Sequence, residues 1–332
     1  MAEKYCDPNA GGADDGSTKI NAWQTLQKAA DTATAGDTVL CRHTDTPDET
    51  LAATIDFDTN AGTGTSRINF VGVNTSWVED GTQYVLDANS SALRCIYINA
   101  KSYITMKNFE CMNTTGDGVQ GTATSVGVVL ENLYIHDCAV YCLDIYGLAE
   151  SLVIRCRMND SLRGWNRTGG YYHIACEMIG NSQQGCASIK ADTLIGCIIA
   201  DNTLEGLDQY GGGHFDMQCV WDNNGGPGGI DVRQNSSFGW SFSGRFTNNT
   251  GFGIAQNTNT GWIENYNIFY GNNGELGGSV LPGLQSRGDE AEHVFDDVTQ
   301  DGYVDDGNDD YNIAEGQLYR ILEWTLPRNY VP

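Results

Sequence analysis

The sequence has few basic residues, and it has no long hydrophobic run. Only 18 Lys and Arg stand against 43 Asp and Glu, so the formal net charge at pH 7 is −25. A surface of that sign repels phosphate groups and anionic lipids, so we expect no nucleic-acid partner and no membrane insertion. No apolar run approaches the ~20 residues of a membrane-spanning helix. Residues 1–8 also lack the basic and apolar regions of a secretory signal, which predicts folding in the cytoplasm.

The cysteines lack the pattern of a metal module or of a disulfide framework. There are 11 of them, an odd number, and no Cys-x-x-Cys pair occurs between Cys6 and Cys219. Several lie in short apolar runs, where a free Cys packs as a small hydrophobic residue. We therefore expect free thiols and folding in a reducing compartment.

The chain is nevertheless rich in turns and apolar residues, with 41 Gly, 6 Pro and 40% hydrophobic residues. Two positions recur along its middle with a shared period. A turn residue after a short apolar run recurs every 21 to 25 residues, at Asn113, Cys138, Asp160, Asn181, Asn202, Asn224, Asn249 and Asn273. A second position, usually Gly, recurs every 21 to 24 residues, at Gly118, Cys142, Gly164, Gly185, Gly206, Gly229, Gly253 and Gly277.

Each repeat holds about three runs of strand length and no helical pattern, so it cannot bury its own apolar face. Successive repeats must stack, and the simplest closed coil is a parallel β-helix of about 9–11 coils. Stacking at ~4.8 Å predicts an amide ladder in the Asn column. Gly in the second column permits positive φ or a close approach. The alignment of Trp221 with Phe246, one repeat apart, predicts a packing column.

Both ends of the chain differ from the repeats. Residues 22–30 have apolar residues at helical spacing, which predicts a helix that caps the first coil, because an open end would expose strand edges. We expect three regions: an N-terminal strand and capping helix in residues 1–40, the coils in 41–280, and an acidic loop with a C-terminal cap in 281–332.

Three stretches give the chain a resemblance to a known superfamily. The opening segment of the pectin-lyase-like superfamily is similar to residues 5–12, 15–16, 25–29 and 35–39, and its closing segment is similar to residues 310–320. The repeats match its middle. The resemblance covers nearly the whole chain. It implies an all-β, single-stranded right-handed parallel β-helix, but it says little about activity.

The polar residues that follow the Gly column are the candidate site. Asp144, Asp208 and Asp231 occupy equivalent places, and the last two belong to neighbouring repeats. Two carboxylates one coil apart could share a proton or hold a cation, as glycoside hydrolysis or calcium-assisted lyase chemistry requires. The alternative is that these are ordinary surface carboxylates of an acidic solenoid.

Nearby residues complete two candidate sets. Asp208, Asp231, Arg233 and His214 are the catalytic candidates, and Asp144, Tyr210 and Trp240 are the carbohydrate-binding candidates. The resemblance does not extend to the motifs of polygalacturonases: only Asp201-Asn202-Thr203 and Gly213-His214-Phe215 approach them, and the Asp-Asp and Arg-Ile-Lys elements are missing.

An acidic segment near the C-terminus resembles an EF-hand calcium loop through Asp297, Asp301 and Asp305, although Asn308 occupies the twelfth position and Asp309 follows one residue late. The alternative is a solvated acidic turn. Apart from this candidate Ca²⁺ site at Asp297, Asp301, Asp305 and Asp309, we expect no cofactor.

Three functions fit these features: a virion structural protein, a carbohydrate-binding adhesin, and a polysaccharide lyase or glycoside hydrolase. The absence of an export signal and the free thiols favour a bacteriophage protein made in the host cytoplasm. We expect a capsid decoration protein at the virion surface, homo-oligomeric and most simply trimeric, that contacts the major capsid protein or another virion protein and could bind host polysaccharide. The alternatives are a tailspike depolymerase or an extracellular enzyme.

Overall fold

The computed structural model describes most of the repeat region. The described residues are 2–44, 46–122, 124–145, 151–167, 171–188, 192–209, 212–233, 237–256, 261–265, 267–278, 303–304 and 312–313. The chain divides into two compact units, Met1–Gly288 and Asp289–Pro332. In the second unit, β30 (Tyr303–Val304) pairs with β31 (Asn312–Ile313) in antiparallel fashion. The candidate calcium ligands Asp297, Asp301, Asp305 and Asp309 lie outside the described residues.

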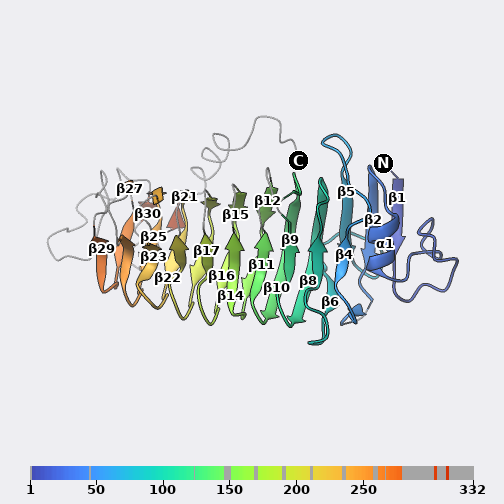
Figure 1. Cartoon of the computed structure of the whole chain (residues 1–332), viewed down its shortest axis with the longest axis horizontal. Helices are drawn as coiled ribbons and strands as arrows, with labels where there is room; N and C mark the ends of the chain where they lie inside the picture. Colours follow the sequence, from blue (N-terminus) through green and yellow to red (C-terminus); the bar gives the residue numbers. More distant parts are fainter. Residues whose placement is uncertain are drawn as a thin grey trace. The chain divides into compact units, whose positions relative to one another are not determined.

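The first unit is an all-β parallel solenoid, as the repeats predict. Its strands form one 19-stranded and one 10-stranded sheet, here called sheet A and sheet B. Each regular coil passes through two strands of sheet A and then one strand of sheet B, and every pairing between coils is parallel. Figure 1 shows the strands side by side in the order of the sequence, from β1 to β29.

Sheet B consists of β4 (Ile55–Phe57), β7 (Ile96–Ile98), β9 (Val119–Gly121), β11 (Tyr141–Ile145), β14 (Arg163–Arg167), β17 (Cys186–Ser188), β20 (Leu207–Gln209), β23 (Gly228–Val232), β26 (Phe252–Gln256) and β29 (Gly274–Gly278). The first strands of the coils in sheet A are β1 (Ala2–Cys6), β2 (Asp37–Arg42), β5 (Ile68–Val73), β8 (Ile104–Thr114), β10 (Val129–Cys138), β12 (Ser151–Ile154), β15 (Tyr171–Ile174), β18 (Asp192–Ile195), β21 (Gly212–Met217), β24 (Ser237–Phe242) and β27 (Gly261–Asn265). The second strands are β3 (Glu49–Thr50), β6 (Tyr84–Asp87), the later halves of β8 and β10, β13 (Arg157–Asn159), β16 (Glu177–Ile179), β19 (Ile198–Ala200), β22 (Val220–Asp222), β25 (Arg245–Thr247) and β28 (Ile268–Tyr270).

A sharp corner separates the two strands of sheet A in each coil. One residue there takes a left-handed conformation, with φ of 52° at Arg155, 52° at Ala175 and 59° at Gly196. Only Gly adopts this conformation without a steric cost. The stacking of the coils therefore imposes the corner on Arg155 and Ala175, whose own preferences oppose it.

The interior is filled by columns of like side chains. The rings of Trp221 and Phe246 stack with centroids 6.0 Å apart, and Phe269 continues the column 5.0 Å from Phe246, which confirms the predicted packing column. All 11 cysteines are buried free thiols. Because side chains in the interior stack on equivalents from the next coil, the core is continuous along the solenoid.

The predicted amide ladder is present. Its members in five successive coils are Asn181, Asn202, Asn224, Asn249 and Asn272. Each Nδ2 donates to Oδ1 of the following member at 2.8–3.1 Å. Each Nδ2 also donates to a backbone carbonyl of an earlier coil, for example from Asn202 to Met178 at 3.0 Å. The ladder therefore satisfies turn groups that would otherwise be buried without partners.

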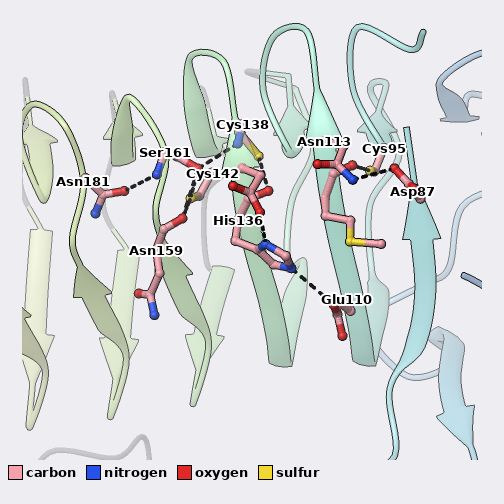
Figure 2. A network of polar contacts seen from close by, with 12 residues as sticks. Asp87, Cys95, Glu110, Asn113, His136, Cys138, Cys142, Asn159, Ser161 and Asn181 are labelled. Carbon is pink, nitrogen blue, oxygen red and sulfur yellow. Dashed lines mark hydrogen bonds and ion pairs between the residues drawn. The ribbon is translucent and has the colours of Figure 1, made fainter. Parts of the chain in front are cut away.

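The register of this ladder differs from the sequence prediction at both ends. Asn272, and not Asn273, is its last member. Asp160 adopts the left-handed conformation one residue before the ladder, and Ser161 takes the ladder position. The N–H of Ser161 donates to Oδ1 of Asn181 at 3.3 Å, and its Oγ accepts from the N–H of Cys138 at 2.9 Å (Figure 2). Asn113 is likewise left-handed and bonds to Asp87.

The Gly column is explained by close approach of neighbouring coils. A Cβ at Gly164 would lie 2.6 Å from the carbonyl oxygen of Gly185, and one at Gly206 would lie 2.7 Å from that of Gly229. Neither residue has a positive φ in the left-handed range. Of the two reasons the sequence left open, lack of space is therefore the one that holds at these positions.

The helix α1 (Leu26–Thr32) begins later than its apolar pattern suggested. Thr25 is the N-cap and accepts from the N–H of Lys28, while Trp23 lies outside the helix and forms a bridge with Cys6. Leu26, Ala29 and Ala30 are buried. That α1 closes the first coil stays a prediction. No helix within the described ranges is long and apolar enough to span a membrane.

Candidate functional site

The outer face of sheet B carries a column of mainly polar residues. Alternation along the strands places apolar residues inside and one central residue on the other face, as in β23, where Ile230 and Val232 flank Asp231. The register aligns these central residues from coil to coil. We call this set the outer column: Asp56, Tyr97, Gln120, Asp144, Asn166, Ala187, Asp208, Asp231 and Ala255.

Three carboxylates and one guanidinium meet near the end of this column, and we call them the acid centre. Asp208 and Asp231 are direct partners on β20 and β23, as their equivalent places in the repeat predicted. Glu205 lies in the turn before β20, and Arg233 follows β23. Nε of Arg233 lies 3.1 Å from Oδ1 of Asp208 and 2.5 Å from Oδ2 of Asp231, and its Nη2 contacts Oε1 of Glu205.

The local sequence explains why these groups converge. Because Gly206 and Gly229 have no side chain, the turns before β20 and β23 can pack closely against each other. Glu205, directly before Gly206, therefore lies close to the carboxylates of the sheet. Glu205, Asp208 and Asp231 are 1%, 5% and 1% exposed, whereas the side chain of Arg233 is 33% exposed. Arg233 is thus the member of the acid centre that meets solvent.

Burial changes the protonation of the acid centre. It raises the pKa of Asp208 to about 7, because desolvation outweighs the lowering effect of Arg233 and Glu205 raises the pKa further. Burial also raises the pKa of Asp231, against the hydrogen bond from Arg233. Neighbouring carboxylates with raised pKa are the arrangement in which one acid holds a proton near neutral pH while its partner stays ionised.

The acid centre has the ligand types of a metal site, but Arg233 competes for the same oxygens. One ligand oxygen from each of Glu205, Asp208 and Asp231 lies within 4.8 Å of the others. The guanidinium contacts all three residues, so it already supplies a positive charge to them. A hard cation could bind all three carboxylates only by displacing Arg233.

Asp144 lies between two amide side chains on the neighbouring strands, and we call Gln120, Asp144 and Asn166 the amide cluster. Nε2 of Gln120 donates to Oδ2 of Asp144 at 2.7 Å and to Oδ2 of Asp117 at 3.1 Å. Nδ2 of Asn166 donates to Oδ1 of Asp144 at 3.1 Å. Burial raises the pKa of Asp117 to about 6, with a further contribution from Asp144, and burial also raises the pKa of Asp144.

The remaining predicted site residues lie elsewhere. His214 belongs to β21 of sheet A, where its side chain is fully buried with Nε2 3.5 Å from Oδ2 of Asp216, so it does not join the acid centre. Trp240 is 46% exposed on β24 of sheet A. Tyr210 lies outside the described residues. The sequence therefore placed Asp208, Asp231 and Arg233 together correctly, but not His214.

Three members of these groups were missed from the sequence. Glu205 directly precedes Gly206 in the Gly column, so a comparison of residues before each landmark Gly would have found it. Gln120 and Asn166 are in register with Asp144. A search of the column for amides as well as carboxylates would have found both.

The fold is shared with proteins of known structure. An alginate lyase from Paenibacillus sp. superposes with a TM-score of 0.61 at 10% identity, covering 77% of this chain and 95% of that chain. A pectate lyase gives 0.60 at 16% identity, with 91% and 82% covered. A tailspike protein from Escherichia coli O157:H7 bacteriophage CAB120 gives 0.53 at 15% identity, with 82% and 38% covered.

These likenesses establish the fold class. The neighbours are pectate-lyase-like right-handed parallel β-helix proteins, and this chain shares that architecture. No protein-family model matches the sequence, and no curated protein matches it.

Proposed function

We propose that this chain is a carbohydrate-active β-helix protein that binds a polysaccharide on the outer face of sheet B and cleaves it at the acid centre. The observation that carries the proposal is the in-register pair Asp208 and Asp231, joined by Glu205 and Arg233. The pectate lyase and alginate lyase among the structural neighbours support a polysaccharide as the ligand.

The geometry favours glycoside hydrolysis with retention. Oxygens of Asp208 and Asp231 lie within 4.8 Å of each other, close to the ~5–5.5 Å between the carboxyl groups of retaining glycosidases. Asp208, protonated up to about pH 7, donates its proton to the glycosidic oxygen. Asp231 attacks the anomeric carbon as the leaving sugar departs, and an ester bond forms. Water then cleaves this ester while the Asp208 carboxylate accepts a proton from the water.

Arg233 and Glu205 are positioning residues in this scheme. The guanidinium holds Asp231 through the 2.5 Å contact and so favours its ionised form. Glu205 accepts from Nε2 of Gln184 at 3.2 Å, which ties the acid centre to the preceding coil. Their loss is expected to change the pH profile more than the binding of substrate.

The test is cleavage of a panel of neutral and acidic polysaccharides by the full chain and by Asp208→Asn. Hydrolysis releases reducing ends without new ultraviolet absorbance, whereas a lyase leaves an unsaturated sugar whose double bond absorbs in the ultraviolet. Loss of activity in Asp208→Asn, with unchanged melting, supports the acid centre. Equal activity in the two proteins contradicts it.

A virion surface protein is the second candidate. The tailspike neighbour supports it, although this chain spans 38% of that protein. The buried free thiols fit folding in a reducing host cytoplasm. In this case the protein is a capsid decoration or tail-associated protein, trimeric on the particle and able to bind host glycan. Mass spectrometry of purified particles tests this: hundreds of copies indicate decoration, a few tens a tail spike, and absence contradicts the virion role.

A further inference from the structure

The amide cluster lies on the same column as the acid centre and faces the same way. Asp144 is separated from Asp208 by Asn166 and Ala187, which makes three strand steps of ~4.8 Å, or about 14 Å along the solenoid. Gln120, Asp144 and Asn166 are all partly exposed, in contrast to the buried carboxylates of the acid centre. A polymer lying along sheet B would therefore pass over both groups.

The amides of this cluster are arranged as acceptors for hydroxyl groups. Gln120 and Asn166 each use their side-chain N–H groups on Asp144, from opposite sides. Among the described residues, Oε1 of Gln120 and Oδ1 of Asn166 accept no hydrogen bond. Because Asp144 fixes both amides in orientation, these two oxygens are held on the outer face, where they can accept from sugar hydroxyls.

Two tyrosines lie on strands of the same sheet as the amide cluster. Tyr97 precedes Gln120 in the outer column, and the guanidinium of Arg94 lies 5.0 Å from its ring centroid. Tyr141 lies on β11, the strand that carries Asp144, and its hydroxyl accepts from Nη1 of Arg163 at 2.8 Å. Flat rings held in place by Arg provide apolar surface against which a sugar ring can pack.

The charges on this face oppose a sugar that carries a carboxylate. The amide cluster contains the carboxylate of Asp144, its Gln120 donates to a second carboxylate at Asp117, and Arg94 lies 3.8 Å from Asp117. Arg163 is bound to Gln184 and to Tyr141, and Arg233 is bound to the three carboxylates of the acid centre. Among the side chains that the structure describes here, a uronate carboxylate would thus meet like charges, and the guanidinium groups of Arg94, Arg163 and Arg233 already have partners.

We propose that Gln120, Asp144 and Asn166 form a second carbohydrate subsite, which takes uncharged sugars through their hydroxyl groups and excludes uronates. This inference rests on the proposed function, since it assigns the substrate class of the same face. It predicts that a glycan runs along the axis of the solenoid, with uncharged residues over the amide cluster and the scissile bond at the acid centre.

The test is affinity electrophoresis of the full chain in gels that contain one polysaccharide each. Polygalacturonate and its fully methyl-esterified form are a matched pair, because esterification removes the charge and keeps the backbone. Alginate and a set of neutral glucans, galactans, mannans and xylans complete the panel, each with Ca²⁺ and with a chelator. We expect retardation by one or more uncharged polymers and none by polygalacturonate or alginate.

Variants assign the binding to the amide cluster. Gln120→Ala and Asn166→Ala should each lower the affinity for the retarding polymer roughly tenfold, because each variant loses one hydrogen bond to a sugar hydroxyl. Thr193→Ala, a partly exposed residue of sheet A, is the matched control and should bind as the parent does. Melting curves establish that each variant is folded, and Asn166→Ala keeps the test valid if Gln120→Ala does not fold.

The outcomes separate the subsite from the proposed function. Stronger retardation by polygalacturonate or alginate, abolished in Asp208→Asn, overturns the substrate class but keeps carbohydrate chemistry at the acid centre. Retardation by an uncharged polymer that both amide variants retain overturns the subsite alone. Failure of every polymer to retard the chain overturns the proposed function together with this inference.

Discussion

Nδ2 of Asn202 donates to Oδ1 of Asn224 at 2.9 Å and to the carbonyl oxygen of Met178 at 3.0 Å, so one side chain joins three successive coils. Oδ1 of Asn202 in turn accepts from Nδ2 and from the backbone N–H of Asn181. The amide is fully used in a site that is 1% exposed. Buried networks of this kind are costly to break because the remaining groups lose their partners.

Asn202→Ala is therefore expected to lower the free energy of unfolding by about 3 kcal/mol, since several buried polar groups are left without partners. The measurement is urea denaturation followed by circular dichroism. Thr203→Ala, at the exposed neighbouring position, is the control and should change stability little. Equal midpoints for the two variants would show that the ladder does not hold the coils together.

Gly164→Ala tests close approach between coils. The added methyl carbon would lie 2.6 Å from the carbonyl oxygen of Gly185 and 3.2 Å from that of Met158, and backbone atoms cannot move aside independently. We expect a loss of ~1–3 kcal/mol, as for other overpacked cores. Gly11→Ala, where nothing lies within 4 Å, is the control. A melting temperature of Gly164→Ala equal to that of Gly11→Ala would contradict this reason for the Gly column.

The acid centre predicts a pH-dependent cleavage rate. Because burial raises the pKa of Asp208 to about 7, the proton donor is lost as the pH rises through that value, and the rate should fall on the alkaline side. The folded state also keeps a proton that the unfolded state releases near 3.8, so this group destabilises the fold increasingly between pH 4 and 7. Asp58→Asn, at an exposed position outside the acid centre, is the control, and its rates against pH should coincide with those of the parent. An alkaline limb well above pH 8 would exclude Asp208 as the donor.

His136 predicts a stability change of known sign. Burial lowers its pKa, but the hydrogen bonds with Glu110 and Asp137 outweigh this effect and raise the pKa above 6.5. Figure 2 shows the contact between His136 and Glu110. The stabilisation is complete below pH 6.5 and is lost as the pH rises through the raised pKa. Asp208 and Asp117 titrate in the same pH range, so the melting temperature of one protein alone would mix their effects with that of His136. The quantity to measure is therefore the difference in melting temperature between the parent and His136→Asn. This difference should shrink from pH 6 to pH 9, and a constant difference would contradict the prediction.

The burial of the cysteines predicts that their thiols react slowly with alkylating reagents in the native protein. All 11 cysteines are buried free thiols that form no disulfide. A thiol reagent should therefore label almost none of them in the native protein and all of them in denaturant. The measurement is the intact mass after alkylation under each condition. Rapid native labelling of several cysteines would mean that the coils open readily or that the packing differs from the one described.

The structural consequences of the repeat were largely readable from the sequence. The shared period of two columns required stacked coils, and it placed Asp208 and Asp231 in neighbouring coils at equivalent positions. It also predicted the ladder of Asn181, Asn202 and Asn224 and the stacking of Trp221 on Phe246. These features depend only on equivalent positions in adjacent repeats, and a period read along the chain fixes such positions.

Two kinds of feature could be found only from the tertiary structure: the exact residue at which a column begins or ends, and the sheet to which a strand belongs. A shift of one residue separates Asn113 and Asp160 from the ladder, because a strand or turn presents a different direction at each successive residue. His214 is close to Asp208 in sequence, yet its strand belongs to sheet A, and its side chain is buried beside Asp216.

The acid centre shows the same division between its members. The sequence alone determined that Asp208 and Asp231 would stack, since they share one column of the repeat. Only the folded chain brought Glu205 to them, because this residue lies in the turn before β20, which packs closely against the next coil at Gly206 and Gly229. The raised pKa of Asp208 is likewise a tertiary property, since burial, its main cause, exists only once the coils have stacked.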